Sequence, residues 1–227
     1  PKRVFAHGWW TNEGQKISKS LGNVIDPIEL VNKYGLDQVR YFLLREVPFG
    51  NDGDFSHRAM VNRMNGELAN DYGNLAQRVL AMIAKNCDGR MPAPDIFTVD
   101  DNNLLAQASS LEGALRELID AQAFHEALDA IWTVIRAANA YVNTQAPWKL
   151  RKEDPRRMAT VLYVVADTIR QLAILTQPFM PDASAKLLDQ LGVIHGNRVF
   201  ERLSSQLTYE TVLPAPQGVF PRFQEDV

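Results

Sequence analysis

Cysteine is nearly absent from this 227-residue chain, which contains only Cys87. A single thiol excludes an internal disulfide and fits a reducing compartment. One cysteine and four scattered histidines give no spacing typical of a metal site, so we expect no metal site within the chain. No apolar run approaches the roughly 20 residues of a membrane-spanning helix, and the start lacks the pattern of a secretion signal. These absences predict a cytoplasmic protein with no membrane partner.

An excess of positive charge is also missing. Lys and Arg number 24 against 27 Asp and Glu, so the net charge is −3, whereas a nucleic-acid-binding domain is usually basic. The charge is uneven, however, because five cations fall within nine residues: Lys149, Arg151, Lys152, Arg156 and Arg157. A solvated loop between helices and a contact surface for phosphates both fit this run. A hydrophobic content of 46% is typical of a globular chain, which at this length forms one or two domains.

A run of lysine and serine lies near the start of the chain. Residues 14–23 read GQKISKSLGN. Two lysines and two serines followed by Gly-Asn suit neither a core segment nor a strand. A loop of this composition can place both cations on one side and add hydroxyl and amide donors for phosphate oxygens. A solvated Lys/Ser loop is the alternative that the run alone leaves open.

The motifs around this loop resemble those of the methionyl-tRNA synthetases, a family of class I aminoacyl-tRNA synthetases. The loop resembles their KMSKS signature, with Ile17 where Met is commonest. Further matching runs follow in the family's order: FAHGWW (5–10), NVIDP (23–27), YFLLRE (41–46) and DGDFS (52–56). The resemblance extends over essentially the whole chain. Because the chain enters motif sequence directly at Pro1, we expect a C-terminal portion of a longer enzyme that is inactive in isolation.

The resemblance implies a chemistry for the lysine loop. In the family, the carboxylate of methionine attacks the α-phosphate of ATP, supplied with Mg²⁺, and the adenylate is then transferred to tRNA(Met). Lys19 is the implied catalytic cation that stabilises the charge developing on the phosphates, with Lys16 in support and Ser18 and Ser20 holding the loop on ATP. A glycine-flanked loop can open and close in this role. No residue is assigned as general base; His7 is either near the site or an ordinary hydrogen-bonded strand histidine. The methionine pocket is expected outside this chain.

A second pattern lies on the first long helix. Asn70, Asn74 and Arg78 are four residues apart, so they share one helical face with a shift of roughly 40° per step. This face resembles the anticodon-reading helix of the family. Trp148, which ends the run NTQAPW, takes the family position where an aromatic ring stacks on the first base of the CAU anticodon. A solvated polar face and a buried tryptophan are the alternatives; Trp132 is expected to be core.

The hydrophobic spacing predicts a mainly α fold, a helical bundle preceded by a small α/β segment. Residues 1–55 are expected to form the α/β stem-contact segment with the lysine loop, at the end of the catalytic domain. Residues 56–198 would form the anticodon-binding domain, and 199–227 a proline-rich tail. That tail resembles one that closes a synthetase body without a dimerisation module, which implies a monomer. We predict a strand over 3–10, a linker over 92–101, a helix starting at Asp26, and helices over 37–46, 56–86, 104–120, 123–143, 155–176 and 181–191.

Two other readings of the sequence stay open. One is another class I synthetase, for leucine, valine, isoleucine or cysteine, against which the pairing of Asn74 and Arg78 with the Ala146-Pro147-Trp148 run argues. The other is a non-catalytic tRNA-binding module that has kept the lysine loop as a relic. The intact lysines and serines of the loop argue against that module.

Overall fold

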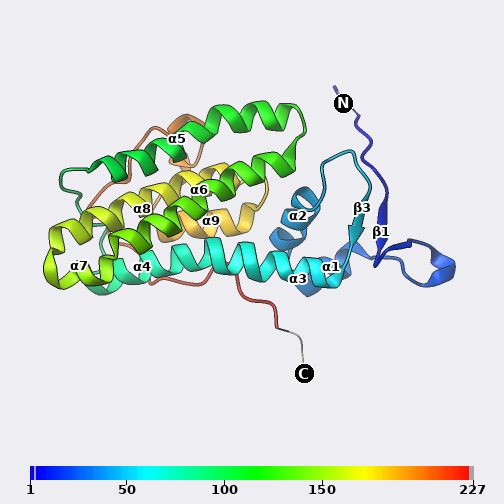
Figure 1. The fold of residues 1–227 in the computed structure, drawn as a ribbon, viewed down its shortest axis with the longest axis horizontal. Helices are drawn as coiled ribbons and strands as arrows, with labels where there is room; N and C mark the ends of the chain where they lie inside the picture. Colours follow the sequence, from blue (N-terminus) through cyan, green and yellow to red (C-terminus); the bar gives the residue numbers. More distant parts are fainter. Residues whose placement is uncertain (3, 225–227) are drawn as a thin grey trace.

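Helices make up most of the molecule, as the spacing of its apolar residues predicts. The computed structural model describes residues 1–2 and 4–224, and Figure 1 shows a helical bundle drawn out along one axis with a small sheet at one end. The predicted fold class is therefore confirmed. The strands are β1 (Trp10–Asn12), β2 (Gln15–Lys16) and β3 (Gly53–Phe55). The α-helices are α1 (Pro27–Tyr34), α2 (Leu36–Arg45), α3 (His57–Asn62), α4 (Asn74–Asn86), α5 (Val99–Asp120), α6 (Phe124–Gln145), α7 (Pro147–Glu153), α8 (Pro155–Thr176) and α9 (Pro181–Gln190).

The sheet has the order β2-β1-β3, with β2 antiparallel and β3 parallel to β1. Glu13 and Gly14 both have positive φ, 50° and 75°, which is the backbone of a tight hairpin turn between β1 and β2. The strand predicted over 3–10 is wrong, since the strand begins only at Trp10; residue 3 lies outside the described residues. Val4 and Trp9 are 86% and 83% exposed. The Trp9 backbone bonds to the segment that begins β3, since its carbonyl accepts from the Gly53 amide at 2.8 Å and its amide donates to Asp52 Oδ1 at 2.7 Å.

The helix predicted over 56–86 is one continuous helical rod with a π-helical middle. It runs through α3, a π-helical segment η2 (Arg63–Gly73) and α4. Ser56 caps its start by accepting a hydrogen bond from the Ala59 amide at 3.0 Å. The predicted apolar stripe is buried along most of its length, including Leu68, Tyr72 and Leu75. The rod thus joins the sheet at one end of the molecule to the far end of the bundle (Figure 1).

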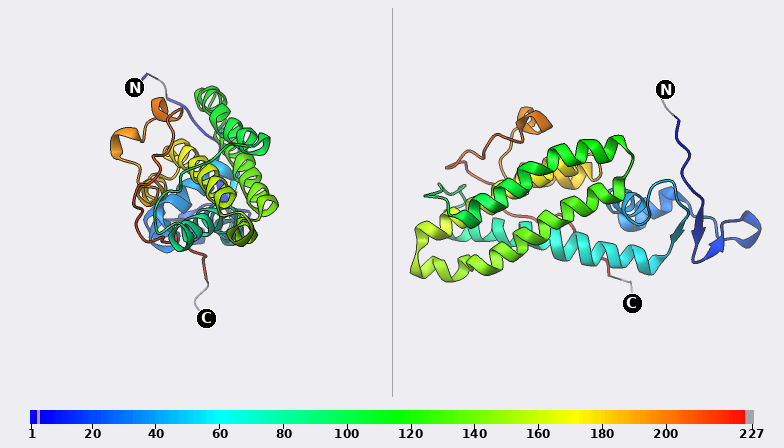
Figure 2. Two further views of the ribbon diagram at one scale, coloured as in Figure 1. Left: turned by 90° about the vertical axis from the view of Figure 1, so that its left-hand side faces the viewer. Right: turned by 45° about the horizontal axis from the view of Figure 1, so that its top comes forward.

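Helix α8 forms the centre of the bundle, and its predicted bounds of 155–176 are confirmed. Helices α4, α5, α6, α7 and α9 all contact it, and the end-on view in Figure 2 shows the other helices around it. The expectation that no apolar run approaches the length of a membrane span needs a correction. The α8 helix is long enough and has a mean hydropathy of 1.5 over its most apolar window, but 94% of that window is buried inside the structure. It is the core helix of the bundle.

Two helix starts in the bundle were missed by the sequence analysis. The predicted linker over 92–101 is shorter, because Thr98 and Asp101 form a capping box that starts α5 at Val99. Residues 147–153 form the helix α7, which the sequence analysis did not predict. Pro147 does follow the end of α6, but it also occupies the first turn of a new helix, where its missing N–H is not needed.

The α/β segment is fixed to the bundle by polar side chains of α2. Arg40 donates to the carbonyls of Phe179 and Pro178 at 2.9 and 2.7 Å. Asp37 accepts from the Ala183 amide at 2.6 Å and so caps α9 from a distance. Burial raises the pKa of this Asp37 carboxyl. These contacts set the position of the sheet and its lysine loop relative to the bundle.

The C-terminal tail returns along the rod toward the sheet (Figure 1). Phe220 packs against Tyr72 with ring centroids 5.6 Å apart. Further along, the backbone of Phe223 forms two hydrogen bonds with the Asn65 side chain, at 2.8 and 3.2 Å. These contacts attach the described part of the tail to η2.

Candidate functional site

The lysine loop projects from the β1–β2 hairpin at one end of the molecule (Figure 1). After Lys16 the chain forms a short 3₁₀ turn, η1 (Lys19–Leu21), which Gly22 ends with a positive φ of 65°. Asn23 closes the loop, because its Oδ1 accepts from the Ser18 amide at 2.8 Å and its Nδ2 donates to the Lys16 carbonyl at 3.0 Å. The six residues between Lys16 and Asn23 are thus held at their base by a single amide side chain.

The lysines and serines of the loop lie on its exposed part. The side chains of Lys16 and Lys19 are exposed, and no hydrogen bond or ion pair joins them to the described residues. The Ser18 and Ser20 hydroxyls contact each other at 2.8 Å, and Ser18 Oγ also accepts from the Ser20 amide at 3.3 Å. Two uncompensated ammonium groups beside two hydroxyls form an arrangement that can receive phosphate oxygens. Because its charged groups are lysines, the loop fits phosphate oxygens rather than a metal ion.

Metal ligands and a general base find little support in the geometry. Among residues 1–2 and 4–224, no group of three or more His, Cys, Asp or Glu side chains is placed to hold a metal ion. His7 is exposed, packs on Phe49 with ring centroids 5.8 Å apart, and contacts the Gly8 carbonyl through Nδ1 at 2.7 Å. Its described contacts are those of a surface histidine.

A second candidate site lies at the opposite end of the bundle, where α4 meets α7 (Figures 1 and 2). The Arg78 guanidinium lies over the Trp148 ring, 5.7 Å from the ring centre. Arg78 Nη2 also donates to Asn143 Oδ1 at 3.2 Å. Trp148 is 45% exposed, whereas Trp132 is completely buried, as the sequence predicts for both. The result is an aromatic ring with a cation over it and a partly open surface, which can stack on a flat ligand.

The structure places Arg78 beside Trp148, whereas Asn70 contacts the C-terminal tail. Asn74 is exposed on the first turn of α4, one turn before Arg78. Asn70 is in the π-helical segment, where its Oδ1 accepts from Arg222 of the tail at 2.6 Å. The π-helical turns change the phase between Asn70 and Asn74, because an i→i+5 helix does not keep the 3.6-residue period that the sequence argument used.

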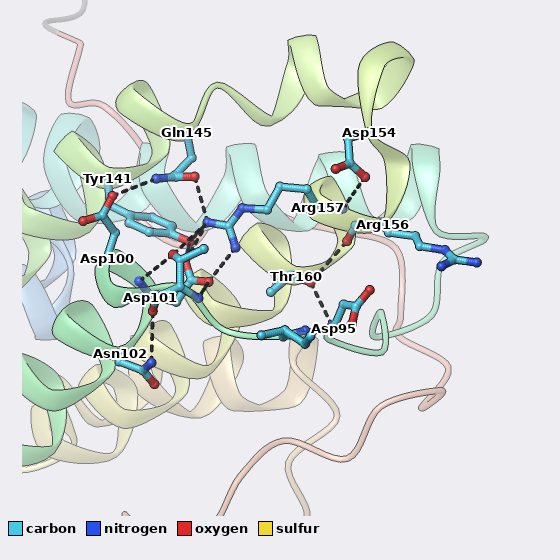
Figure 3. Close-up of polar contacts among 12 residues, drawn as sticks. Asp95, Asp100, Asp101, Asn102, Tyr141, Gln145, Asp154, Arg156, Arg157 and Thr160 are labelled. Atoms are coloured by element: carbon cyan, nitrogen blue, oxygen red, sulfur yellow. Dashed lines mark hydrogen bonds and ion pairs between the residues drawn. The ribbon is translucent and has the colours of Figure 1, made fainter.

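A polar network behind α7 was missed by the sequence analysis. Figure 3 shows Arg157 of α8 reaching back to Asp101 of α5 and to Tyr141 and Gln145 of α6. The guanidinium binds both Asp101 oxygens, at 2.5 and 2.7 Å, and Tyr141 donates to the same carboxylate at 2.5 Å. Burial alone would raise the pKa of Asp101, but the hydrogen bonds from Arg157 and Tyr141 lower it to about 2. The only local signal for this network was the Thr-x-x-Asp spacing of the capping box at 98–101.

Comparison with known proteins assigns both ends to one family. Residues 1–80 match the family model "tRNA synthetases class I (M)", and residues 91–226 match the "Anticodon binding domain of methionyl tRNA ligase". The chain belongs to the methionyl-tRNA synthetase family. This membership excludes the reading as a leucine, valine, isoleucine or cysteine enzyme. A methionine–tRNA ligase of Brucella suis biovar 1 (strain 1330) is 57% identical over 226 residues, which are 99% of this chain and 44% of that protein.

Solved structures of methionyl-tRNA synthetases share the fold. The Mycobacterium tuberculosis methionyl-tRNA synthetase in complex with methionyl-adenylate superposes with a TM-score of 0.94 at 51% identity, covering 98% of this chain and 44% of that one. The free form of the same enzyme gives a TM-score of 0.92 at 48% identity, covering 100% and 45%. The chain therefore spans less than half the length of the methionyl-tRNA synthetases that it matches.

Proposed function

We propose that this chain supplies the phosphate-binding loop and the anticodon-binding domain of a methionine–tRNA ligase. The observation that carries the proposal is the cation over an exposed ring formed by Arg78 and Trp148, at the end of the bundle opposite the lysine loop. The reaction joins methionine to ATP as methionyl-adenylate, releases pyrophosphate, and transfers the methionyl group to tRNA(Met). Methionine would bind to a portion of the enzyme outside this chain.

In the first half-reaction, Lys19 would contact the phosphates as negative charge builds on the departing pyrophosphate. A cation that closes on these oxygens in the transition state lowers the barrier without strengthening ground-state binding. Lys16 would support it, and Ser18 and Ser20 would donate to phosphate oxygens of Mg·ATP. The exposed, uncompensated state of both lysines supports these roles. The ion itself would be held by the ATP phosphates, as part of the substrate.

In tRNA recognition, Trp148 would stack on the first base of the CAU anticodon. Arg78, whose guanidinium lies over the Trp148 ring, would bridge from that base to a neighbouring phosphate. The exposed Asn74 amide offers a donor and an acceptor for a base edge. Asn70 would contribute less, because Arg222 already occupies its carbonyl oxygen. The ligands would be tRNA(Met), ATP and methionine, and the enzyme would act as a cytoplasmic monomer.

Binding of the complete enzyme to anticodon stem-loops tests this function. We expect a CAU loop to bind better than loops with permuted anticodons at one fixed, low salt concentration. Trp148→Ala should weaken CAU binding by about 1–3 kcal/mol, the value of one base–aromatic stack. Trp9→Ala, which removes the 83%-exposed tryptophan at the opposite end, is the matched control and should not change CAU binding. Equal, salt-sensitive binding to every loop would leave only phosphate attraction and would refute anticodon recognition.

A further inference from the structure

The α7 corner, residues 145–154, carries Trp148 between two long helices and turns sharply at its start. Ala146 joins α6 to α7 with φ 46° and ψ 58°, a left-handed conformation that a residue with a side chain rarely adopts. Its carbonyl accepts from the Lys149 amide at 2.8 Å and its amide donates to Val142 at 3.0 Å, so both helices end on this one residue. Trp148 is two residues further on. A strained pivot of this kind persists only where the surrounding contacts determine it.

Two of those contacts come from Arg157 on the next helix, one from its side chain and one from its backbone. Arg157 Nη2 donates to Oε1 of Gln145, the residue before the pivot, at 2.7 Å. The Arg157 amide donates to Asp154, the last residue of the corner, at 3.0 Å. Arg157 therefore bonds to both ends of the corner that presents Trp148, but its side chain holds only the Gln145 end (Figure 3).

The Arg157 guanidinium is itself fixed. It forms a two-pronged ion pair with Asp101, whose side chain is completely buried, and only 17% of the Arg157 side chain is exposed. Tyr141 donates to the same carboxylate. The planar guanidinium forms two hydrogen bonds to the carboxylate and a third to Gln145, so it has little freedom to move. A lysine at this position could not form the same set of hydrogen bonds.

We propose that Arg157 is a positioning residue for anticodon recognition: anchored by Asp101, it fixes the α7 corner through Gln145 and so sets the place of the Trp148 ring. Arg157 does not contact the Arg78–Trp148 pair in its described interactions, so it acts through the corner. The inference rests on the proposed role of Trp148 in binding the anticodon and adds a residue on another helix to that role.

A double-mutant cycle in the complete enzyme tests the inference, with the CAU stem-loop as probe. Arg157→Met should weaken CAU binding about tenfold, within the roughly 5- to 150-fold that losing a base–aromatic stack costs. In a Trp148→Ala background the same substitution should change binding by less than about twofold, because a residue that acts through the ring has nothing left to position. The rate of ATP–pyrophosphate exchange should not change in Arg157→Met.

Two further variants keep the test decisive. Gln145→Ala removes the link from Arg157 to the pivot and leaves the ion pair with Asp101 in place, so it should fold even where Arg157→Met does not. It also removes the bond from Gln145 Nε2 to Asp100 Oδ2, which is 3.3 Å long. It should weaken CAU binding about threefold with Trp148 present, and not in its absence. Arg156→Met removes the same charge from the neighbouring side chain, which points away from the network (Figure 3), and any effect of it should be equal in both backgrounds.

The outcomes separate the two ideas. If Trp148→Ala leaves CAU binding unchanged, the proposed function of this face fails. If Trp148→Ala weakens binding but Gln145→Ala has no effect, or the effects of Arg157→Met and Gln145→Ala persist in the Trp148→Ala background, anticodon recognition stands and the positioning role of Arg157 is overturned.

Discussion

The lysine loop and the α7 corner are built in opposite ways. The loop leaves both lysines exposed and is closed at its base by Asn23. The corner is held by the buried ion pair between Arg157 and Asp101. A segment with few buried contacts opens at little cost in free energy, whereas separating a buried ion pair is expensive. The groups proposed to meet a changing phosphate charge thus sit where movement is easy, and the ring proposed to meet a base sits where it is fixed.

Lys19→Ala should give the largest effect and tests the loop side of this comparison. We expect adenylate formation by the complete enzyme to fall about 10²- to 10³-fold, as when one transition-state donor is lost. Methionine affinity and the free energy of unfolding should barely change, because the side chain packs on nothing described. ATP–pyrophosphate exchange measures the rate, and Lys186→Ala, at an exposed position of α9, is the control. An unchanged exchange rate would remove Lys19 from the catalytic role.

Acid should weaken the corner and not the loop. The pKa of Asp101 is lowered from 3.8 to about 2 in the folded chain. A lowered folded-state pKa stabilises the fold fully above about pH 4, and this stabilisation, roughly 2 kcal/mol, is lost as the pH falls toward 2. Urea unfolding of this chain between pH 5 and about pH 2.5, followed by circular dichroism, should show that loss.

Asparagine variants show whether Asp101 is the source of this loss of stability at low pH. Asp101→Asn should remove this part of the pH dependence, and Asp100→Asn, at the exposed neighbouring position, should keep it. Equal slopes for the wild type and Asp101→Asn would mean that the ion pair does not stabilise the corner.

Asn23→Ala tests whether the Asn23 hydrogen bonds at the base of the lysine loop contribute to adenylate formation. The substitution removes the hydrogen bonds to the Ser18 amide and the Lys16 carbonyl. Adenylate formation should slow about fivefold, equivalent to about 1 kcal/mol, because the lysines are then less well placed when the loop closes. Asn32→Ala, on the exposed side of α1, should leave the exchange rate as it is. A rate loss as large as that of Lys19→Ala would show instead that the loop is a rigid element.

Asn70→Ala should have the smallest effect. It tests whether the surface proposed to bind the anticodon extends beyond Asn74 to Asn70. Because Arg222 already binds its carbonyl oxygen, we expect CAU stem-loop binding to weaken by less than about 0.5 kcal/mol. Asn74→Ala should cost about 1 kcal/mol, the value of a typical hydrogen bond, in the same titration. The reverse order would extend the face along η2 and require Arg222 to release Asn70 on binding.

The sequence predicted the features that depend on local periodicity. The spacing of Leu68, Tyr72 and Leu75 indicated the buried side of the rod, and the prolines at 155 and 181 marked the starts of α8 and α9. Trp132 and Trp148 were assigned correctly to core and surface because the second follows a helix end and precedes charged residues.

Features that depend on distant partners could not be predicted. Strand β3 has only three residues, too few to show the alternation of polar and apolar residues that marks a strand. It forms through its pairing with β1, about 40 positions earlier in the chain. The network around Arg157 needs α5, α6 and α8 to meet, and nothing in the basic run distinguished Arg157 from the exposed Arg156.

The helical rod from α3 to α4 also separates the two ends electrically. Between His57, which contacts Glu13 of the hairpin, and Arg78 it rises roughly 30 Å. That is nearly four Debye lengths of about 8 Å at physiological ionic strength, so charge placed at one end is almost entirely screened at the other. Cations on the lysine loop and on α7 can therefore be changed independently, and the long rod acts as an electrostatic spacer between the end proposed to bind phosphates and the end proposed to bind a base.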